Sequence, residues 1–126
     1  MTYKFFDTCS LLLKAGHLFE DQSYKTVISS ITLQEIENIK TSRNKDAEIK
    51  YSARKILIEL EEHPNDYETY IFTEDMLEPF THIHLEVNND IKILACAFHY
   101  DVNQHPDETV FVTNDLALKA IANIFF

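Results

Sequence analysis

The stretch Lys4–Leu13, KFFDTCSLLL, decides how the rest of the chain is interpreted. Two phenylalanines are followed directly by Asp7, and a polar turn then leads into three leucines. This order predicts a buried strand over 3–6 that ends at Asp7 and turns into a helix over 8–19. Gly16, the only glycine, is expected to weaken that helix slightly. Because ligands bind beyond the carboxyl ends of strands in α/β folds, chemistry is expected at Asp7.

Further β-like runs alternate with amphipathic helices, and tight hairpin signals are absent. This alternation predicts an α/β fold, a three-layer α/β/α sandwich around a central parallel sheet of four to five strands. The run TVFVT has the continuous apolar character expected of a central parallel strand. Thr32 is expected to cap the second helix. The predicted strands cover residues 3–6, 26–30, 68–73, 81–86 and 109–113, and the predicted helices cover 8–19, 32–40, 46–63, 88–100 and 116–124.

Composition sets the class of protein. With 126 residues and 45% hydrophobic side chains, residues 1–126 are expected to form a single domain with one compact core. The apolar ending 124–126 allows either a terminal strand or truncation of a longer protein. No apolar run approaches the roughly 20 residues of a membrane span, and no signal peptide is recognisable, so a cytoplasmic location is expected. Cys9 and Cys96 are expected to be free thiols in the core.

Three aspartates share a place in the predicted fold, because Asp7, Asp90 and Asp115 each lie near the start of a helix. Taken singly, each is explained as a helix cap or as an acid at the positive end of a helix dipole. Glu35 has a similar explanation, since it follows Thr32 with the spacing of a capping box. However, Asp7 and Asp115 also follow buried strands, and in a parallel sheet both would emerge at the same edge.

As a set, these acids point to a metal ion. Several carboxylates at one edge would repel one another unless a cation lay between them. Hard oxygen ligands suit Mg²⁺ or Mn²⁺, which keep bound waters and bind substrate phosphates. Such a site can activate water and stabilise the charge of an in-line attack on a phosphodiester. The sequence therefore predicts a metal site formed by Asp7, Glu35, Asp90 and Asp115.

Five segments, in this order along the chain, resemble elements of the PIN-domain ribonucleases. They are the opening strand and aspartate FFDTCSLL, the helix TLQEIENIK, the Ala-Arg element at Ser52–Arg54, the helix start NNDIKILACA and the strand ending VFVTNDLALKA. The second and third are most similar to PIN domains attached to PhoH-type ATPases. The set is also similar to VapC-type toxins.

The resemblance implies a metal-dependent endoribonuclease that hydrolyses RNA phosphodiester bonds with metal-activated water. It makes Asp7, Asp90 and Asp115 ligands of Mg²⁺ or Mn²⁺, and Glu35 a further ligand or the group that orients the attacking water. It implies as partners an RNA substrate, an antitoxin protein or an attached ATPase domain, and a second copy of the chain. Two alternatives remain open, a catalytically silent RNA- or protein-binding module and a structure-selective DNA nuclease. The expected supporting residues are Thr8, Ser10, Thr113 and Asn114.

The net charge of −10 disfavours broad attraction to nucleic acid, but basic residues crowd one segment. That segment is interpreted either as a positive face for RNA or as a solvated helix face paired with Asp46 and Glu48. Within it, Lys40, Arg43 and Arg54 are expected to contact the substrate. The crowded basic residues are Lys40, Arg43, Lys45, Lys50, Arg54 and Lys55.

The histidines of the run 81–86 raise the question of a zinc site. His82 and His84 have the spacing of half a site, but no Cys or His pair lies close in sequence to complete it. They are therefore predicted to be solvent-facing strand residues.

Overall fold

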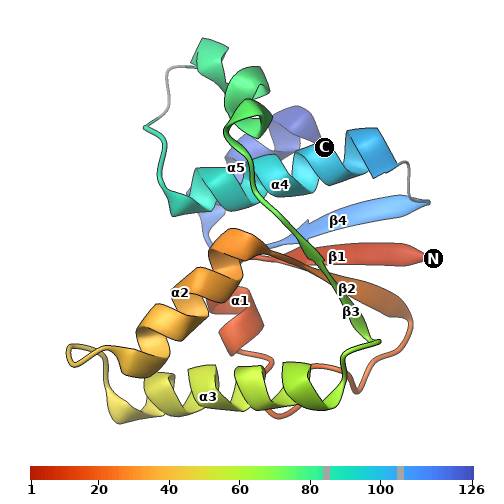
Figure 1. Ribbon diagram of the computed structural model, residues 1–126. Coiled ribbons are helices and arrows are strands. Elements are labelled where there is room, and N and C mark those ends of the chain that lie inside the picture. The colour runs from red at the N-terminus through yellow and green to blue at the C-terminus, as the bar shows by residue number, and fades with distance from the viewer. Residues whose placement is uncertain (84–85, 105–106) are drawn as a thin grey trace.

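The computed structural model describes residues 1–83, 86–104 and 107–126. Its centre is a sheet of four parallel strands in the order β3-β2-β1-β4 (Figure 1). The predicted three-layer fold around a parallel sheet of four to five strands is confirmed. The strands are β1 (Thr2–Phe6), β2 (Tyr24–Ser29), β3 (Tyr67–Tyr70) and β4 (Glu108–Val112). The helices are α1 (Thr8–Leu12), α2 (Ser30–Thr41), α3 (Ala47–Glu62), the 3₁₀ helix η1 (Glu74–Ile83), α4 (Asn89–Gln104) and α5 (Leu116–Phe125).

The helices cover both faces of the sheet, and each face has its own apolar core. Successive residues of a strand point to opposite faces, so Phe5 packs with α4, α5 and η1 while Phe6 packs with α1, α2 and α3. Val27 and Ile28 of β2 divide in the same way. In Figure 1, α4 and α5 lie above the sheet and α2 and α3 below it. In the part of the chain that the structure describes, no helix has the length and apolarity that crossing a bilayer requires.

The prediction of a central position for TVFVT is wrong, because β4 pairs only with β1 and forms an edge of the described sheet. The central strand is instead β1, which lies between β2 and β4. Helices on both faces cover an edge strand as well as a central one, so both give a continuous apolar run. Sequence pattern therefore does not distinguish the two positions.

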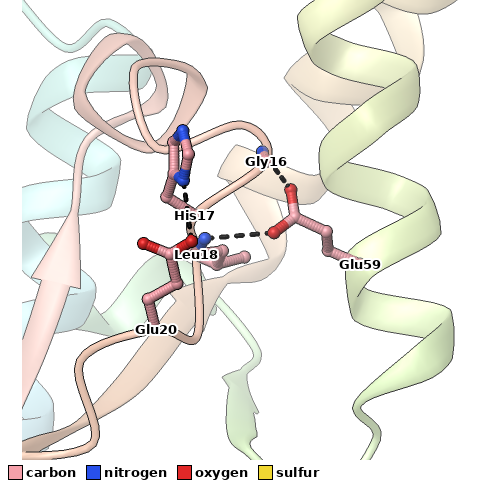
Figure 2. A network of polar contacts seen from close by, with 5 residues as sticks. All are labelled: Gly16, His17, Leu18, Glu20 and Glu59. Carbon is pink, nitrogen blue, oxygen red and sulfur yellow. Dashed lines mark hydrogen bonds and ion pairs between the residues drawn. The ribbon is translucent and has the colours of Figure 1, made fainter.

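The predicted helix over 8–19 is also too long. The helix α1 ends at Leu12, and Gly16 adopts a backbone φ of +89°, which is unfavourable for residues with a Cβ atom. Figure 2 shows what holds the turn that replaces the helix. The Glu59 carboxylate of α3 accepts hydrogen bonds from the backbone N–H groups of Gly16 (2.6 Å) and Leu18 (3.0 Å). This turn keeps Leu18 buried as the helical pattern required.

Replacing Glu59 with Ala is expected to lower the free energy of unfolding by about 1.5–3 kcal/mol, because two backbone donors lose a charged acceptor. Thermal or urea denaturation measures the loss. Glu62→Ala is the matched control, because Glu62 lies exposed on the same helix and its substitution removes the same kind of side chain. Equal effects of the two substitutions would show that the turn does not depend on Glu59.

Two further local predictions require correction. The N-cap of α2 is Ser29, not Thr32, because the Ser29 hydroxyl accepts hydrogen bonds from the N–H groups of Ile31 (3.0 Å) and Thr32 (3.3 Å). The predicted strand over 81–86 is wrong at 81–83, where the chain continues the 3₁₀ helix η1. Pro79 inside η1 removes a backbone donor there. His84 and Leu85 of that prediction lie outside the described residues.

Candidate functional site

The pairing of β1 with β4 brings together two acids from opposite ends of the chain. Phe6 is in register with Val112, and the N–H of Asp7 donates to the Val112 carbonyl at 3.0 Å. Asp7 follows β1 directly, and Asp115 lies three residues beyond the last residue of β4. Because the strands are parallel, both acids emerge at the carboxyl edge of the sheet.

Glu35 and Asp90 reach this edge from helices. Glu35 lies on α2, and its Oε1 accepts a hydrogen bond from the Thr8 hydroxyl at 2.5 Å. Asp90 lies in the first turn of α4. The N–H of Ile91 donates to the side-chain oxygen of Asn88 at 3.0 Å, so Asn88 supplies the capping bond at this end of α4. The carboxylate of Asp90 is therefore not required as a helix cap.

All four acids line a single cleft of about 600 Å³. The cleft opens at the carboxyl edge of the sheet, between the start of α4 and the side of α2. Besides the acids it is lined by Thr8, Cys9, Leu12, Asn38, Ile39, Ser42, Lys45, Asn89 and Asn114. The structure therefore places Asp7, Glu35, Asp90 and Asp115 around one cavity.

Capping explains part of the position of two of the acids. Asp7 caps α1 by accepting from the N–H of Ser10 at 2.8 Å, and Asp115 caps α5 by accepting from the N–H of Leu118 at 3.1 Å. Thr113 connects the two acids. Its hydroxyl donates to Asp7 Oδ2 at 2.5 Å and accepts from the N–H of Asp115 at 3.0 Å. Capping and lining the cleft are thus compatible roles, and the caps fix where these carboxylates lie.

The electrostatics of the cleft reflect the shared negative charge. Partial burial raises the pKa of Asp90, and the negative charges of Glu35, Asp7 and Asp115 raise it further. Partial burial also raises the pKa of the Cys9 thiol, together with the charges of Asp7, Asp90 and Glu35, while Lys45 opposes this effect. The other three carboxylates are thus close enough to Asp90 to disfavour its ionisation, as expected of a site that attracts cations.

The donor set fits a hard divalent cation that keeps part of its water shell. Within residues 1–83, 86–104 and 107–126, no three His, Cys, Asp or Glu side chains are gathered closely enough to hold a metal ion together. Mg²⁺ does not need three such ligands, because it usually binds through one or two carboxylates and retains several waters. Carboxylates around an open cleft satisfy that requirement, whereas a structural zinc site with four protein ligands does not fit.

The other predicted site residues differ in position. Thr8 and Asn114 line the cleft. Thr113 is not among the lining residues, but its hydroxyl donates to the Asp7 carboxylate. The Ser10 hydroxyl is buried and has no hydrogen-bond partner among the described residues. Sequence reasoning missed Asn38, Ser42, Lys45 and Asn89, which also line the cleft. The signal for Asn38 and Ser42 was their spacing of three and seven residues from Glu35, which places them on the same face of α2.

The three basic residues expected to bind substrate lie elsewhere. The Lys40 ammonium pairs with the Glu37 carboxylate at 2.9 Å. Lys40 and Arg54 line a separate hollow of about 280 Å³. Arg43 is exposed in the connection between α2 and α3 and is not among the residues lining the acid cleft. The structure therefore brings none of these three side chains into the cleft, and their substrate-binding role stays a prediction.

The two cysteines provide a test of the acid cluster that needs no metal. The predicted core position is wrong for Cys9, which is exposed at the cleft because it follows Asp7 at the carboxyl edge of the sheet. Cys96 is buried, and burial raises its pKa to about 12. We expect one thiol, that of Cys9, to react with a disulfide reagent in the native protein. Because its pKa is raised, the rate should keep rising as the pH increases beyond the ordinary thiol pKa. Asp90→Asn should speed this reaction at pH 8, because one charge that raises the Cys9 pKa is removed.

The control for the thiol reaction is Asp101→Asn, which makes the same change near the other end of α4. It should leave the Cys9 rate as it is in the wild type. A Cys9 rate that is equally insensitive to Asp90→Asn would contradict the arrangement described above.

Comparison with known proteins agrees with this architecture. A chain of the crystal structure of VapBC2 from Rickettsia felis, bound to a DNA fragment from their promoter, matches with a TM-score of 0.58. The match covers 98% of this chain and 95% of that chain at 20% sequence identity, so it supports the fold. The chain has no match among curated proteins. The family model described as PIN domain matches residues 5–125, and the chain therefore belongs to the PIN domain family.

Proposed function

We propose that this protein is a metal-dependent ribonuclease and that the acid cleft is its active site. The observation that supports the proposal is the convergence of four carboxylates, from four separate segments, on one cleft at the carboxyl edge of a parallel sheet. Membership of the PIN domain family adds to it. The proposed catalytic residues are Asp7, Glu35, Asp90 and Asp115.

In this proposal, Asp7, Asp90 and Asp115 hold Mg²⁺ or Mn²⁺, and Glu35 is a further ligand or orients the attacking water. The cation would supply Lewis acidity and lower the pKa of a water molecule. The protein itself orients the carboxylates. Thr113 holds the Asp7 carboxylate in place by donating to Oδ2. Thr8 holds the Glu35 carboxylate in the same way through Oε1. Such bonds fix the orientation of ligands and therefore matter for metal affinity.

The proposal is tested with labelled single-stranded RNA, and single-stranded DNA of the same sequence, incubated with pure protein in Mn²⁺ or in EDTA. We expect cleavage of RNA in Mn²⁺ only. A preparation of Asp7→Asn, purified in the same way, reports contaminating nuclease. Cleavage of DNA in preference to RNA would support the DNA-nuclease alternative. Equal cleavage by wild type and variant would overturn the proposal.

One observation favours a second candidate, a catalytically silent module that binds RNA or protein. Among the described residues, no three His, Cys, Asp or Glu side chains lie close enough together to hold a metal ion. Titration calorimetry with Mn²⁺ and Mg²⁺ separates the two candidates. Binding that is lost in Asp90→Asn supports the nuclease, and no binding at millimolar metal supports the silent module.

A partner protein in the cytoplasm is also part of the proposal. The matched VapBC2 structure is a complex on promoter DNA. On this chain, α5 leaves two large apolar side chains exposed, Leu116 at 81% and Ile124 at 67%. Exposed apolar side chains on one helix suit a protein interface, with an antitoxin or a second copy of the chain as the proposed partner. Size-exclusion chromatography of the protein alone and with co-expressed candidates tests this point.

A further inference from the structure

The cleft has a second wall whose chemistry the four carboxylates do not explain. Beyond them it is lined by Asn38 of α2, by Ser42, which is the C-cap of α2, and by Lys45, in the connection from α2 to α3. These three side chains carry hydrogen-bond donors, and Lys45 also carries a positive charge. Donors placed beside a group of acids point to a ligand that brings its own negatively charged oxygens.

One face of α2 joins the two walls. Glu35, Asn38 and the C-cap residue Ser42 are spaced i, i+3 and i+7, so they follow the same side of α2 and its end. A rise of 1.5 Å per residue separates Glu35 from Ser42 by about 10 Å along the axis. Lys45 lies past that end of α2, where the chain turns toward α3 (Figure 1). The donor wall is therefore displaced along the cleft from the carboxylates, so its ligand differs from the group that the carboxylates surround.

The charge of Lys45 is available to such a ligand. Its side chain is exposed, and among the described residues no carboxylate lies within ion-pair distance of its ammonium. Lys40, at the end of α2, is by contrast occupied by Glu37 at 2.9 Å. On a chain with a net charge of −10, a fixed cation at the cleft is a local exception that attracts an anion.

We propose that Lys45, with Asn38 and Ser42, binds a backbone phosphate of the RNA strand adjacent to the phosphate that lies among the carboxylates. This subsite rests on the proposed ribonuclease function and adds the contact that sets the register of the strand. Contacts to phosphate position a nucleic acid without reading its sequence. The subsite therefore favours a single strand laid along α2, whatever its bases.

The test measures binding of a fluorescein-labelled single-stranded RNA by anisotropy, in EDTA so that no cleavage occurs. Lys45→Met should weaken binding about five- to tenfold at low salt and reduce the slope of log K against log salt by about 1. Lys50→Met is the matched control, because it removes the same charge from the same segment and does not line the cleft. It should weaken binding less than twofold, and Lys45→Arg should retain most of the affinity.

Cleavage kinetics separate this inference from the proposed function. Lys45→Met should raise KM with little change in kcat, whereas loss of a carboxylate removes kcat. If the wild type cleaves RNA and both lysine variants bind and cleave alike, the subsite is overturned and the ribonuclease stands. If the wild type neither cleaves nor binds RNA, the proposed function fails, and the subsite fails with it.

A competing role for Lys45 is that of a counter-ion to the carboxylates. In that role its removal would tighten Mn²⁺ binding in calorimetry and leave RNA affinity at the value for Lys50→Met. That pair of results would overturn the phosphate subsite. Weaker RNA binding by Lys45→Met than by Lys50→Met supports it, because a counter-ion to the acids does not contact the strand.

Discussion

Asp7→Asn is expected to lower RNA cleavage by about 100- to 1000-fold while the protein remains folded. The loss corresponds to roughly 3–4 kcal/mol of transition-state stabilisation, the scale expected when a metal loses a charged ligand. Folding should persist because Asn keeps a side-chain oxygen for the N–H of Ser10 and gains an amide that can donate to the Thr113 hydroxyl. The measurement is the rate of cleavage of labelled RNA in saturating Mn²⁺, with circular dichroism as the folding check.

The control is Asp107→Asn, which makes the same change at the other end of the sheet. Asp107 is exposed and pairs with the N-terminal ammonium at 2.8 Å. Its loss should leave cleavage within twofold of the wild type. If Asp7→Asn and Asp107→Asn cleave RNA equally well, Asp7 is only the cap of α1, and the proposal that the acid cleft is a ribonuclease active site is overturned.

Relative to the wild type, Asp90→Asn should be more stable to heat without metal and less stable with metal. Because the folded-state pKa of Asp90 is raised, the folded chain binds more protons than the unfolded chain between the ordinary and the raised value. Stability conferred by this group therefore falls as the pH rises through that range, and at pH 7 the charged carboxylate opposes folding. In EDTA at pH 7, Asp90→Asn should melt at a higher temperature than the wild type, and at pH 4 the difference should shrink.

In Mn²⁺ the order should reverse. At a metal concentration 100 times the Kd, binding stabilises the wild type by about 2.7 kcal/mol. For a chain of this size that corresponds to a rise in Tm of about 8–13 °C. Asp90→Asn should lose most of this rise, and Asp101→Asn should keep it. A rise of the same size in Asp90→Asn would exclude Asp90 from the metal site.

The fold was largely predictable because buried strands and amphipathic helices repeat with simple periods. One error falls where a distant residue holds the local structure. The helix after Asp7 stops at Leu12, and Glu59, on α3, binds the backbone of the following turn at Gly16 and Leu18. Thr32 has the spacing of a cap, but the end of β2 places Ser29 in that role. The Glu59 contacts join residues 43 and 41 positions apart, which a local pattern does not reveal. The Ser29 cap is local, but it depends on where β2 ends.

The acids of the candidate site could be predicted because each has a local signature, namely the end of a strand or the first turns of a helix. Lys45 has none. It lies in a polar connection among other basic residues, and only the path of that connection brings it to the cleft. The prediction of Lys40, Arg43 and Arg54 did not include Lys45, since composition identifies a basic segment without saying which side chains face the acids. Whether a surface residue of this kind lines the cleft depends on tertiary structure alone.

The pairing of β1 with β4 has a consequence for synthesis of the protein on the ribosome. Asp7 and its Thr113 partner are 106 residues apart in sequence, and Asp115 follows still later. A nascent chain that has emerged only as far as α4 lacks the strand that brings these groups together. The carboxylate cleft is therefore incomplete until β4 and Asp115 have been translated, and shorter polypeptides are expected to lack the proposed ribonuclease activity.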